Sequence, residues 1–399
     1  MPHAAEPVGR LSEVFTAFLL LGLTSFGGPI AHLGYFRTEF VLRRRWLSEQ
    51  AYADLVALCQ FLPGPASSQV GFALGLMRGG AWGAVAAWTA FTLPSAIVLV
   101  LFALGASTLE GPVSLGIIHG LKVTAVAIVA HAVWGMARNL CPDGRRAGIA
   151  LAAVFTVVVV SGPLGQVSAI ALGGLAGLLL CRDQARGDGG RLSVPVSPRA
   201  GNLAGLVFVA LLVGLPLLVW ALPVPTLAVI DAFYRAGALV FGGGHVVLPL
   251  LEAEVVQSGW VTADEFLAGY GAAQAVPGPL FTFAAYLGAL ISPVPSAWLG
   301  ALLALVVIFI PGLLLLVAVL PHWDRFRQWD HARSLMRGAN AAVVGILGAA
   351  LYDPVWTGAI LGPHEFALAL AGFLLLTVWK LPAWGVVILL AGGGVLITL

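Results

Sequence analysis

Two apolar stretches of this chain are interrupted by the same short motif, Q-x-x-P-G-P. The motif reads QFLPGP at residues 60–65 and QAVPGP at residues 274–279. Proline and glycine are the residues least able to continue a helix. In a membrane, a broken helix exposes backbone groups that only surrounding protein or a water-filled cavity can satisfy. A chain with two such breaks must therefore enclose both of them with other helices.

The composition places these breaks in a membrane. Hydrophobic residues make up 60% of the chain and charged residues only 10%, and the mean hydropathy is +0.98, whereas soluble domains contain about 25% charged residues. Apolar stretches of about 15 to 25 residues recur along the chain, as in transmembrane helices, and not the segments of about ten residues that build outer-membrane barrels. We expect an all-α polytopic membrane protein with roughly 9–13 membrane segments.

The two motifs belong to an internal repeat of the whole chain. Gly27 and Gly28 correspond to Gly242 and Gly243 at an offset of 215 (242 − 27). After a one-residue slip the offset is 214, which pairs Gln60 with Gln274 (274 − 60). The repeat predicts four parts: an N-terminal membrane repeat at 1–181, a cytoplasmic linker at 182–200, a connecting transmembrane helix at 201–224 and a C-terminal membrane repeat at 225–399.

Charged loops indicate how the two repeats are oriented, because cytoplasmic loops accumulate Lys and Arg. The loop after the first glycine break contains four arginines, whereas its partner in the second repeat is acidic and contains no basic residue. These residues are Arg37, Arg43, Arg44 and Arg45 in the first repeat, and Glu252, Glu254, Asp264 and Glu265 in the second. The pattern predicts two inverted-topology repeats with re-entrant or broken helices, an architecture of many secondary transporters.

Each break also begins a helix, and a helix N-terminus offers free N–H groups and a positive dipole end to an anion. Duplicated breaks with nearby amides and hydroxyls therefore predict an oxyanion site. The alternative is that Gly and Pro only kink the helices. The candidate ligands are Gly27, Gly28, Gln60, Gly64, Ser67, Ser68, Gly242, Gly243, His245, Gln274, Gly278 and Thr282.

Ionisable residues at membrane depth are few, and each is a functional candidate. His245 is a candidate for proton coupling, with a neutral, hydrogen-bonded core histidine as the alternative. For Glu39 and Glu254, a structural salt bridge or a solvated position is the alternative. Arg43, Arg44 and Arg45 are topology signals, whereas Arg37 is near enough to the break to contribute to an anion's entry path. The candidates for the anion path or for coupling are His32, Arg37, Glu39, Lys122 and Glu254.

At these residues the sequence resembles the chromate ion transporter family, in its long form with two homologous halves. The resemblance rests on SFGGPIAHLGYFRTEF and CQFLPGPASSQVG in the first half, and on VFGGGHVVLPLLEAEVV and QAVPGPLFTF in the second. It covers nearly the whole chain. It implies a multi-pass protein of the cytoplasmic membrane that exports chromate, driven by the proton motive force. The second half has Gly244 and His245 where Pro29 and Ile30 stand, so equal contributions from the two halves are not assumed.

Other function classes fit less well. Sulfate or another oxyanion is the alternative substrate, and a channel would differ only in its flux kinetics. A membrane-embedded phosphatase acting on a lipid pyrophosphate would need clustered carboxylates at the breaks, which contain Gln, Ser and Gly instead. The chain has no P-loop, its three cysteines form no metal-ligand set, and its basic residues form no nucleic-acid surface. We therefore expect no enzyme, no cofactor and no metal; a homodimer is one expectation for the assembly.

Overall fold

The computed structural model describes residues 11–106, 111–181, 195–291, 294, 296–323 and 329–399, and these residues form helices without strands. Six of the described helices are long and apolar enough to cross a membrane. They begin at Ala66, Pro112, Pro163, Pro198, Ala297 and Asp330. Four shorter apolar helices begin at Leu11, Leu280, Pro363 and Ala383. The prediction of an all-helical, multi-pass membrane protein is confirmed.

The chain begins with a helical hairpin, called hairpin 1, at residues 11–43. It consists of α1 (Leu11–Thr24), α2 (Gly28–Phe36) and the π-helical η1 (Arg37–Arg43). Glu13, at the start of α1, accepts a hydrogen bond from Trp46 (3.2 Å) and lies 3.7 Å from Arg44. Because Arg44 and Trp46 follow η1, the chain returns to the end at which it entered.

Hairpin 2 comprises residues 49–78. Its first arm, α3 (Glu49–Phe61), has 13 residues, or about 20 Å, which is shorter than a hydrocarbon core of about 30 Å. The following α4 (Ala66–Ala106) reverses direction at Gly79 and Gly80, whose backbones are not helical. A Cβ on Gly75 would lie 2.4 Å from Gly83 O, although residues eight apart in a straight helix are about 12 Å apart. Residues 66–78 are therefore the second arm, and residues 81–106 form a separate long helix.

The second half repeats this order. Hairpin 3 (residues 225–255) contains α9 (Pro225–Ala238), η2 (Gly244–Val246) and α10 (Val247–Val255); hairpin 4 (residues 263–290) contains α11 (Ala263–Ala273), η3 (Leu280–Thr282) and α12 (Phe283–Leu290). A long helix, α13 (Ala297–Val319), follows. A Cβ on Gly288 would lie 2.3 Å from Gly300 O. The end of α12 and the start of α13 therefore approach each other as closely as the two parts of α4 do at Gly75 and Gly83.

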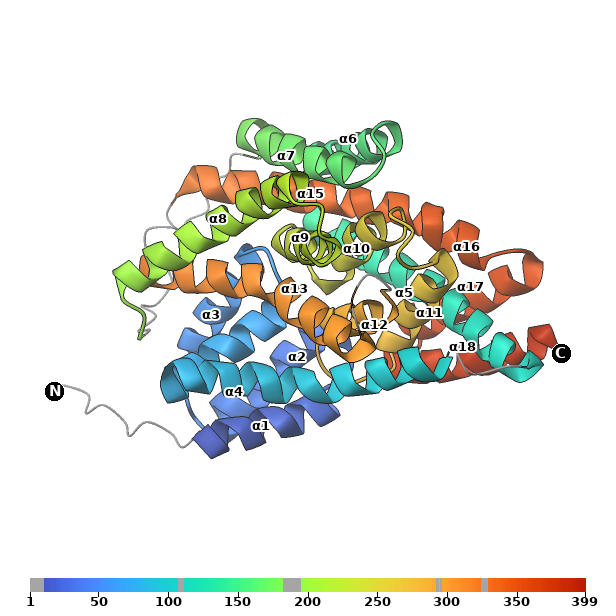
Figure 1. The fold of residues 1–399 in the computed structure, drawn as a ribbon, viewed down its shortest axis with the longest axis horizontal. Helices are drawn as coiled ribbons and strands as arrows, with labels where there is room; N and C mark the ends of the chain where they lie inside the picture. The colour runs from blue at the N-terminus through green and yellow to red at the C-terminus, as the bar shows by residue number, and fades with distance from the viewer. Residues whose placement is uncertain (1–10, 107–110, 182–194, 292–293, 295, 324–328) are drawn as a thin grey trace.

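The remaining long helices of each half pack against helices of the other half. In the first half, α5 (Pro112–Leu140) packs against α18 (Ala383–Thr398) of the second, and α7 (Pro163–Leu180) packs against α15 (Asp330–Ala350) (Figure 1). Small residues allow both contacts: a Cβ on Gly120 would lie 2.3 Å from Leu390 O, and one on Gly338 would lie 2.0 Å from Gly173 O. The two halves are thus interlocked.

Several further helices complete the fold. They are α6 (Gly144–Val159) and α17 (Pro363–Thr377), with the short η4 (Leu320–His322), η5 (Leu351–Trp356) and α16 (Thr357–Ala359). Most of the predicted connecting segment at 201–224 lies in α8 (Pro198–Ala221), a helix most of whose surface is not covered by the protein. The predicted linker at 182–200 lies outside the described residues as far as residue 194. The four-part division of the chain stays a prediction.

Candidate functional site

The breaks of hairpins from opposite halves are joined by two backbone hydrogen bonds. Gly278 N–H donates to Ser25 O (2.9 Å), and Gly64 N–H donates to Val240 O (2.7 Å). These bonds are equivalent in the repeat, since 240 − 25 is 215 and 278 − 64 is 214. A Cβ on Gly244 would lie 3.3 Å from Pro29 and 3.8 Å from Leu280. The tips of all four hairpins therefore meet.

Each P-G-P turn also packs against a proline-containing helix of the other half, which is α13 for the first turn and α4 for the second. Gln69 donates through Nε2 to Pro63 O (3.0 Å) and to Gly312 O (2.9 Å), which follows Pro311 in α13. On the other side, Ser95, which follows Pro94 in α4, donates to Pro277 O. Gly64 and Gly278 have φ values of +120° and +100°, which L side chains rarely adopt. Glycine is required at both turns for this backbone conformation and this close approach.

Histidines link the hairpins within each half. The buried His32 lies with Nδ1 3.3 Å from Ser67 Oγ and Nε2 3.1 Å from Ser25 O, so it connects the tips of hairpins 1 and 2. His245 at the tip of hairpin 3 lies with Nδ1 2.8 Å from the hydroxyl of Tyr270 in α11. Both histidines are hydrogen-bonded near the meeting tips. A proton-coupling role for either one stays a prediction.

The tips carry donors without formal charge. The first N–H groups of α2 and α4, which begin at the tips of hairpins 1 and 2, have no acceptor within their own helices. Among the described residues, three buried side-chain donors near these turns have no hydrogen-bond partner: Ser25 Oγ, Ser68 Oγ and Gln274 Nε2. One buried acceptor, Asn340 Oδ1, also has none. Asn340 belongs to α15, and a Cβ on Gly242 would lie 3.5 Å from its Oδ1. Backbone amides, hydroxyls and carboxamides thus surround the region where the hairpins meet.

Some predicted site residues are placed differently. Gln60, at the end of α3, is exposed, whereas its repeat partner Gln274 is half-buried. Thr282 uses its hydroxyl locally and donates to Pro279 O (2.8 Å). The Gly27–Gly28 turn is open, since a Cβ on Gly28 would meet nothing within 4 Å.

The predicted acidic and basic residues form ion pairs. Glu39 lies 2.5 Å from Arg44 and 3.2 Å from Arg43, and Arg37 lies 2.5 Å from Glu49. Glu254 accepts two hydrogen bonds from Arg235, at 2.9 and 3.0 Å. These contacts agree with the structural salt bridge that the sequence left open. Transport roles for Arg37, Glu39 and Glu254 are untested.

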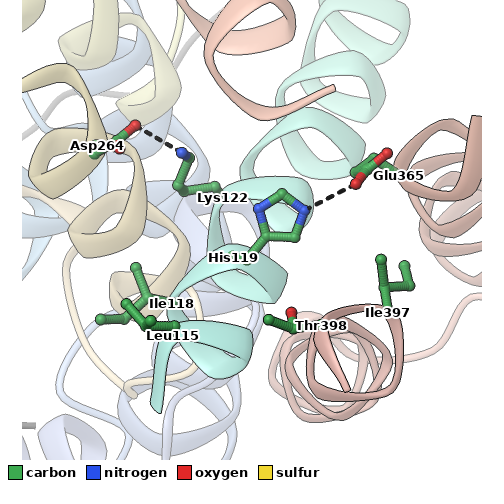
Figure 2. Close-up of a pocket in the computed structure, with 8 residues that line it drawn as sticks. All are labelled: Leu115, Ile118, His119, Lys122, Asp264, Glu365, Ile397 and Thr398. Carbon is green, nitrogen blue, oxygen red and sulfur yellow. Dashed lines mark hydrogen bonds and ion pairs between the residues drawn. The ribbon is translucent and has the colours of Figure 1, made fainter. Parts of the chain in front are cut away.

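Lys122 lies in a separate pocket of about 390 Å³. Its Nζ is 2.6 Å from Asp264 Oδ1, and on the next turn of α5 His119 Nε2 is 3.3 Å from Glu365 Oε1 (Figure 2). Leu115, Ile118, Ile397 and Thr398 complete the lining. Figure 2 shows both basic side chains on α5, with each carboxylate approaching from another helix.

The sequence did not single out Ser25, Gln69, Ser95 or Asn340. Ser25 directly precedes the first glycine break, and Ser95 follows Pro94, so their positions beside the breaks were available as a signal. Gln69 and Asn340 lie within apolar helices. Within the described residues, no three His, Cys, Asp or Glu side chains are grouped as a metal site.

Comparisons with known proteins assign the family. A sequence profile of the chromate transporter family matches residues 12–178 and 227–397. The chain is 29% identical to the probable chromate transport protein of Synechococcus elongatus over 94% of this chain and 92% of that protein. It is 27% identical to the chromate transport protein of Pseudomonas aeruginosa over 98% of this chain and 93% of that protein.

A further relative is the chromate transport protein of Cupriavidus metallidurans, 25% identical over 88% of this chain and 83% of that protein. No solved structure matches significantly. The family is one of transporters and not of enzymes, as the sequence predicted. The profile covers most of both halves, so this chain belongs to the chromate transporter family.

Proposed function

We propose that this protein exports chromate from the cytoplasm as a secondary active transporter of the cytoplasmic membrane, driven by the proton motive force. The observation that carries the proposal is the meeting of four hairpin tips from both halves, tied by the hydrogen bonds of Gly64 and Gly278. Relatives that match nearly the whole chain are named chromate transport proteins. Chromate is a tetrahedral dianion, and the helix N-termini at the tips suit such a ligand.

The donors at the tips suit binding followed by release. Backbone N–H groups and the hydroxyls of Ser25 and Ser68 can surround the anion without a fixed positive charge that would hold it permanently. Sulfate has the same charge and shape, so these donors alone do not separate the two anions. Sulfate or another oxyanion is therefore the second candidate substrate.

Inverted topology of the two repeats is part of the proposal, and two repeat-related helices support it. Arg145, near the start of α6 and therefore close to the end of α5 in the chain, donates to Leu180 O (3.1 Å). Ser334, near the start of α15, donates to Cys181 O (3.2 Å). The end of α5 and the start of α15 thus lie at the same end of α7. Beyond the P-G-P motifs the repeat continues more weakly and pairs Gly120 of α5 with Gly338 of α15 at an offset of 218 (338 − 120). This pairing supports opposite directions for the equivalent helices α5 and α15, which inverted repeats require.

Uptake of radiolabelled chromate into inverted vesicles, with and without an imposed proton gradient, tests the proposal. We expect gradient-dependent uptake by the wild type and loss of uptake in Gly64→Leu and in Gly278→Leu. Gly80→Leu is the matched control, because Gly80 also has a positive φ (+63°) but a Cβ there meets nothing within 4 Å. No uptake by folded wild-type protein would refute chromate transport, uptake without a gradient would refute proton coupling, and full competition by sulfate would favour the second substrate.

A further inference from the structure

The repeat-related helices α3 and α11 have different surroundings. In α11, every residue from Phe266 to Ala273 is buried, and a Cβ on Gly271 would lie 2.2 Å from Leu121 O of α5. The equivalent face of α3, formed by Ala53, Ala57 and Gln60, is exposed. At the offset of 214 these three residues correspond to Leu267, Gly271 and Gln274. In α11 this face is packed, whereas in α3 it is exposed, although Tyr52, Leu55, Leu58 and Cys59 on the remainder of α3 are buried.

The repeat identifies the helix that would cover the exposed face of α3. Because Gly120 corresponds to Gly338 (338 − 120 is 218), Leu121 of α5 corresponds to Ala339 of α15. In the part of the chain that the structure describes, α3 and α15 have no packing comparable to that of α11 and α5. Figure 1 shows α9–α12 among α5, α13 and α15, with α1–α3 to one side of them. The same contact is therefore closed in one half and open in the other.

Two ion pairs that line the pocket of Figure 2 reinforce the contact between α5 and α11. The Lys122–Asp264 and His119–Glu365 pairs join α5 of the first half to α11 and α17 of the second. The Lys122 side chain is 10% exposed and that of Asp264 is 70% exposed, so the Lys122 pair lies where the pocket meets its surroundings. Sequence positions equivalent to Lys122 and Asp264 are Asn340 and Gln50, which carry no charge.

We propose that α5 and α11, sealed by Lys122–Asp264, form the outer gate of the transporter, and that α3 closes on α15 as the inner gate when the outer gate opens. This inference rests on the proposed function, because a transporter of inverted repeats opens its two sides in turn. Ala57 carries a Cβ where Gly271 has none. The inner gate therefore closes less tightly than the outer gate, which favours the state described here, with the outer gate closed.

Cysteine labelling tests the coupling between the gates without chromate. In a chain with Cys141→Ser and Cys181→Ser, Ile118→Cys reports on the pocket, and the buried Cys59 reports on folding. Ala57→Gly removes the Cβ that limits inner closure. We expect this change to speed labelling of Ile118→Cys by a membrane-impermeant maleimide by about tenfold, or about 1.4 kcal/mol, with Cys59 unlabelled. Ala51→Gly, elsewhere on the same helix, is the matched control and leaves the rate unchanged.

Two further variants complete the test. Asp264→Asn removes the outer seal and should also speed labelling, whereas Gln60→Trp, added to Ala57→Gly, should block inner closure and restore the slow rate. The proposal is overturned if Ala57→Gly has no effect, if Ala51→Gly has the same effect, or if Gln60→Trp leaves labelling fast. Fast labelling from the cytoplasmic side alone would overturn the assignment of this gate to the outer face. Because no chromate is present, failure of chromate transport would overturn the proposed function and leave this result unchanged.

Discussion

Replacing Gly278 by alanine should destabilise the tip of hairpin 4. At this position φ is +100°, and the new Cβ would lie 2.3 Å from Ser95 Oγ and 3.2 Å from Phe91 O. A left-handed backbone costs a non-glycine residue about 1–2 kcal/mol, and overpacking costs about 1–3 kcal/mol. We therefore expect the free energy of unfolding to fall by about 2–5 kcal/mol, because both costs apply at the same residue.

A double-mutant cycle with Ser95→Ala separates these two costs. Alone, Ser95→Ala removes a hydrogen bond to Pro277 O and should cost about 1 kcal/mol. It also removes the oxygen nearest to the new Cβ. The double variant should therefore be more stable than the sum of the single changes predicts, with a coupling of about 1–3 kcal/mol. The backbone strain at Gly278 remains in every variant that carries alanine there.

Thermal unfolding in detergent and gradient-driven chromate uptake measure this cycle. Gly80→Ala is the control, since Gly80 has a φ of +63° with nothing within 4 Å of its Cβ and should show only the backbone cost. Strictly additive changes in stability for Gly278→Ala and Ser95→Ala would refute the reasoning. So would an equal loss in Gly80→Ala, because the contact with Ser95 would then contribute nothing.

Three other changes test separate contacts. Gln69→Leu should lower stability by about 1–3 kcal/mol, because Pro63 O and Gly312 O lose their donor; Gln60→Leu on the exposed end of α3 is the control, and equal melting temperatures would contradict the prediction. Gly338→Leu should separate α15 from α7, since its Cβ would lie 2.0 Å from Gly173 O, and unchanged melting and expression would refute this contact. Hydrogen bonds from the backbone and side chain of Arg146 hold the pKa of Asp143 below its usual range. The stability that this carboxylate contributes is therefore present above the unfolded pKa, about 4, and is lost as pH falls through the folded pKa; Asp143→Asn should remove this part of the acid dependence in pH-dependent melting.

Much of the fold could be predicted from local properties of the sequence. The long apolar stretches predict membrane helices, and the P-G-P and FGG segments mark the turns at which the hairpins reverse. The P-G-P and FGG segments act through the backbone of their own residues, because these residues have low helix propensity or adopt a positive φ. The bounds of the hairpin arms depend on packing, however, and the reversal at Gly79 and Gly80 is visible only because Gly75 lies against Gly83.

The candidate site could be predicted only in part. The sequence identified Gly64 and Gly278 as residues of the breaks, but it gave no reason to join them to Val240 and Ser25. Ion pairs such as Arg235 with Glu254 were foreseen only as a structural alternative. Gln60 and Gln274 show the limit most clearly, because equivalent residues in the sequence differ in exposure.

Residue types and their order along the chain are enough to identify a helical membrane protein built from two related halves and broken at matching glycines and prolines. These properties follow from composition and from backbone conformation, which each residue carries with it. Three features emerge only when the helices pack together. Each P-G-P turn is bound by the opposite half, α5 and α15 each pack against a helix of the other half, and α11 is packed on the face that is exposed in α3. Such contacts join residues as far apart as Ser95 and Pro277, which are 182 positions apart, and depend on how all the helices pack together in one molecule.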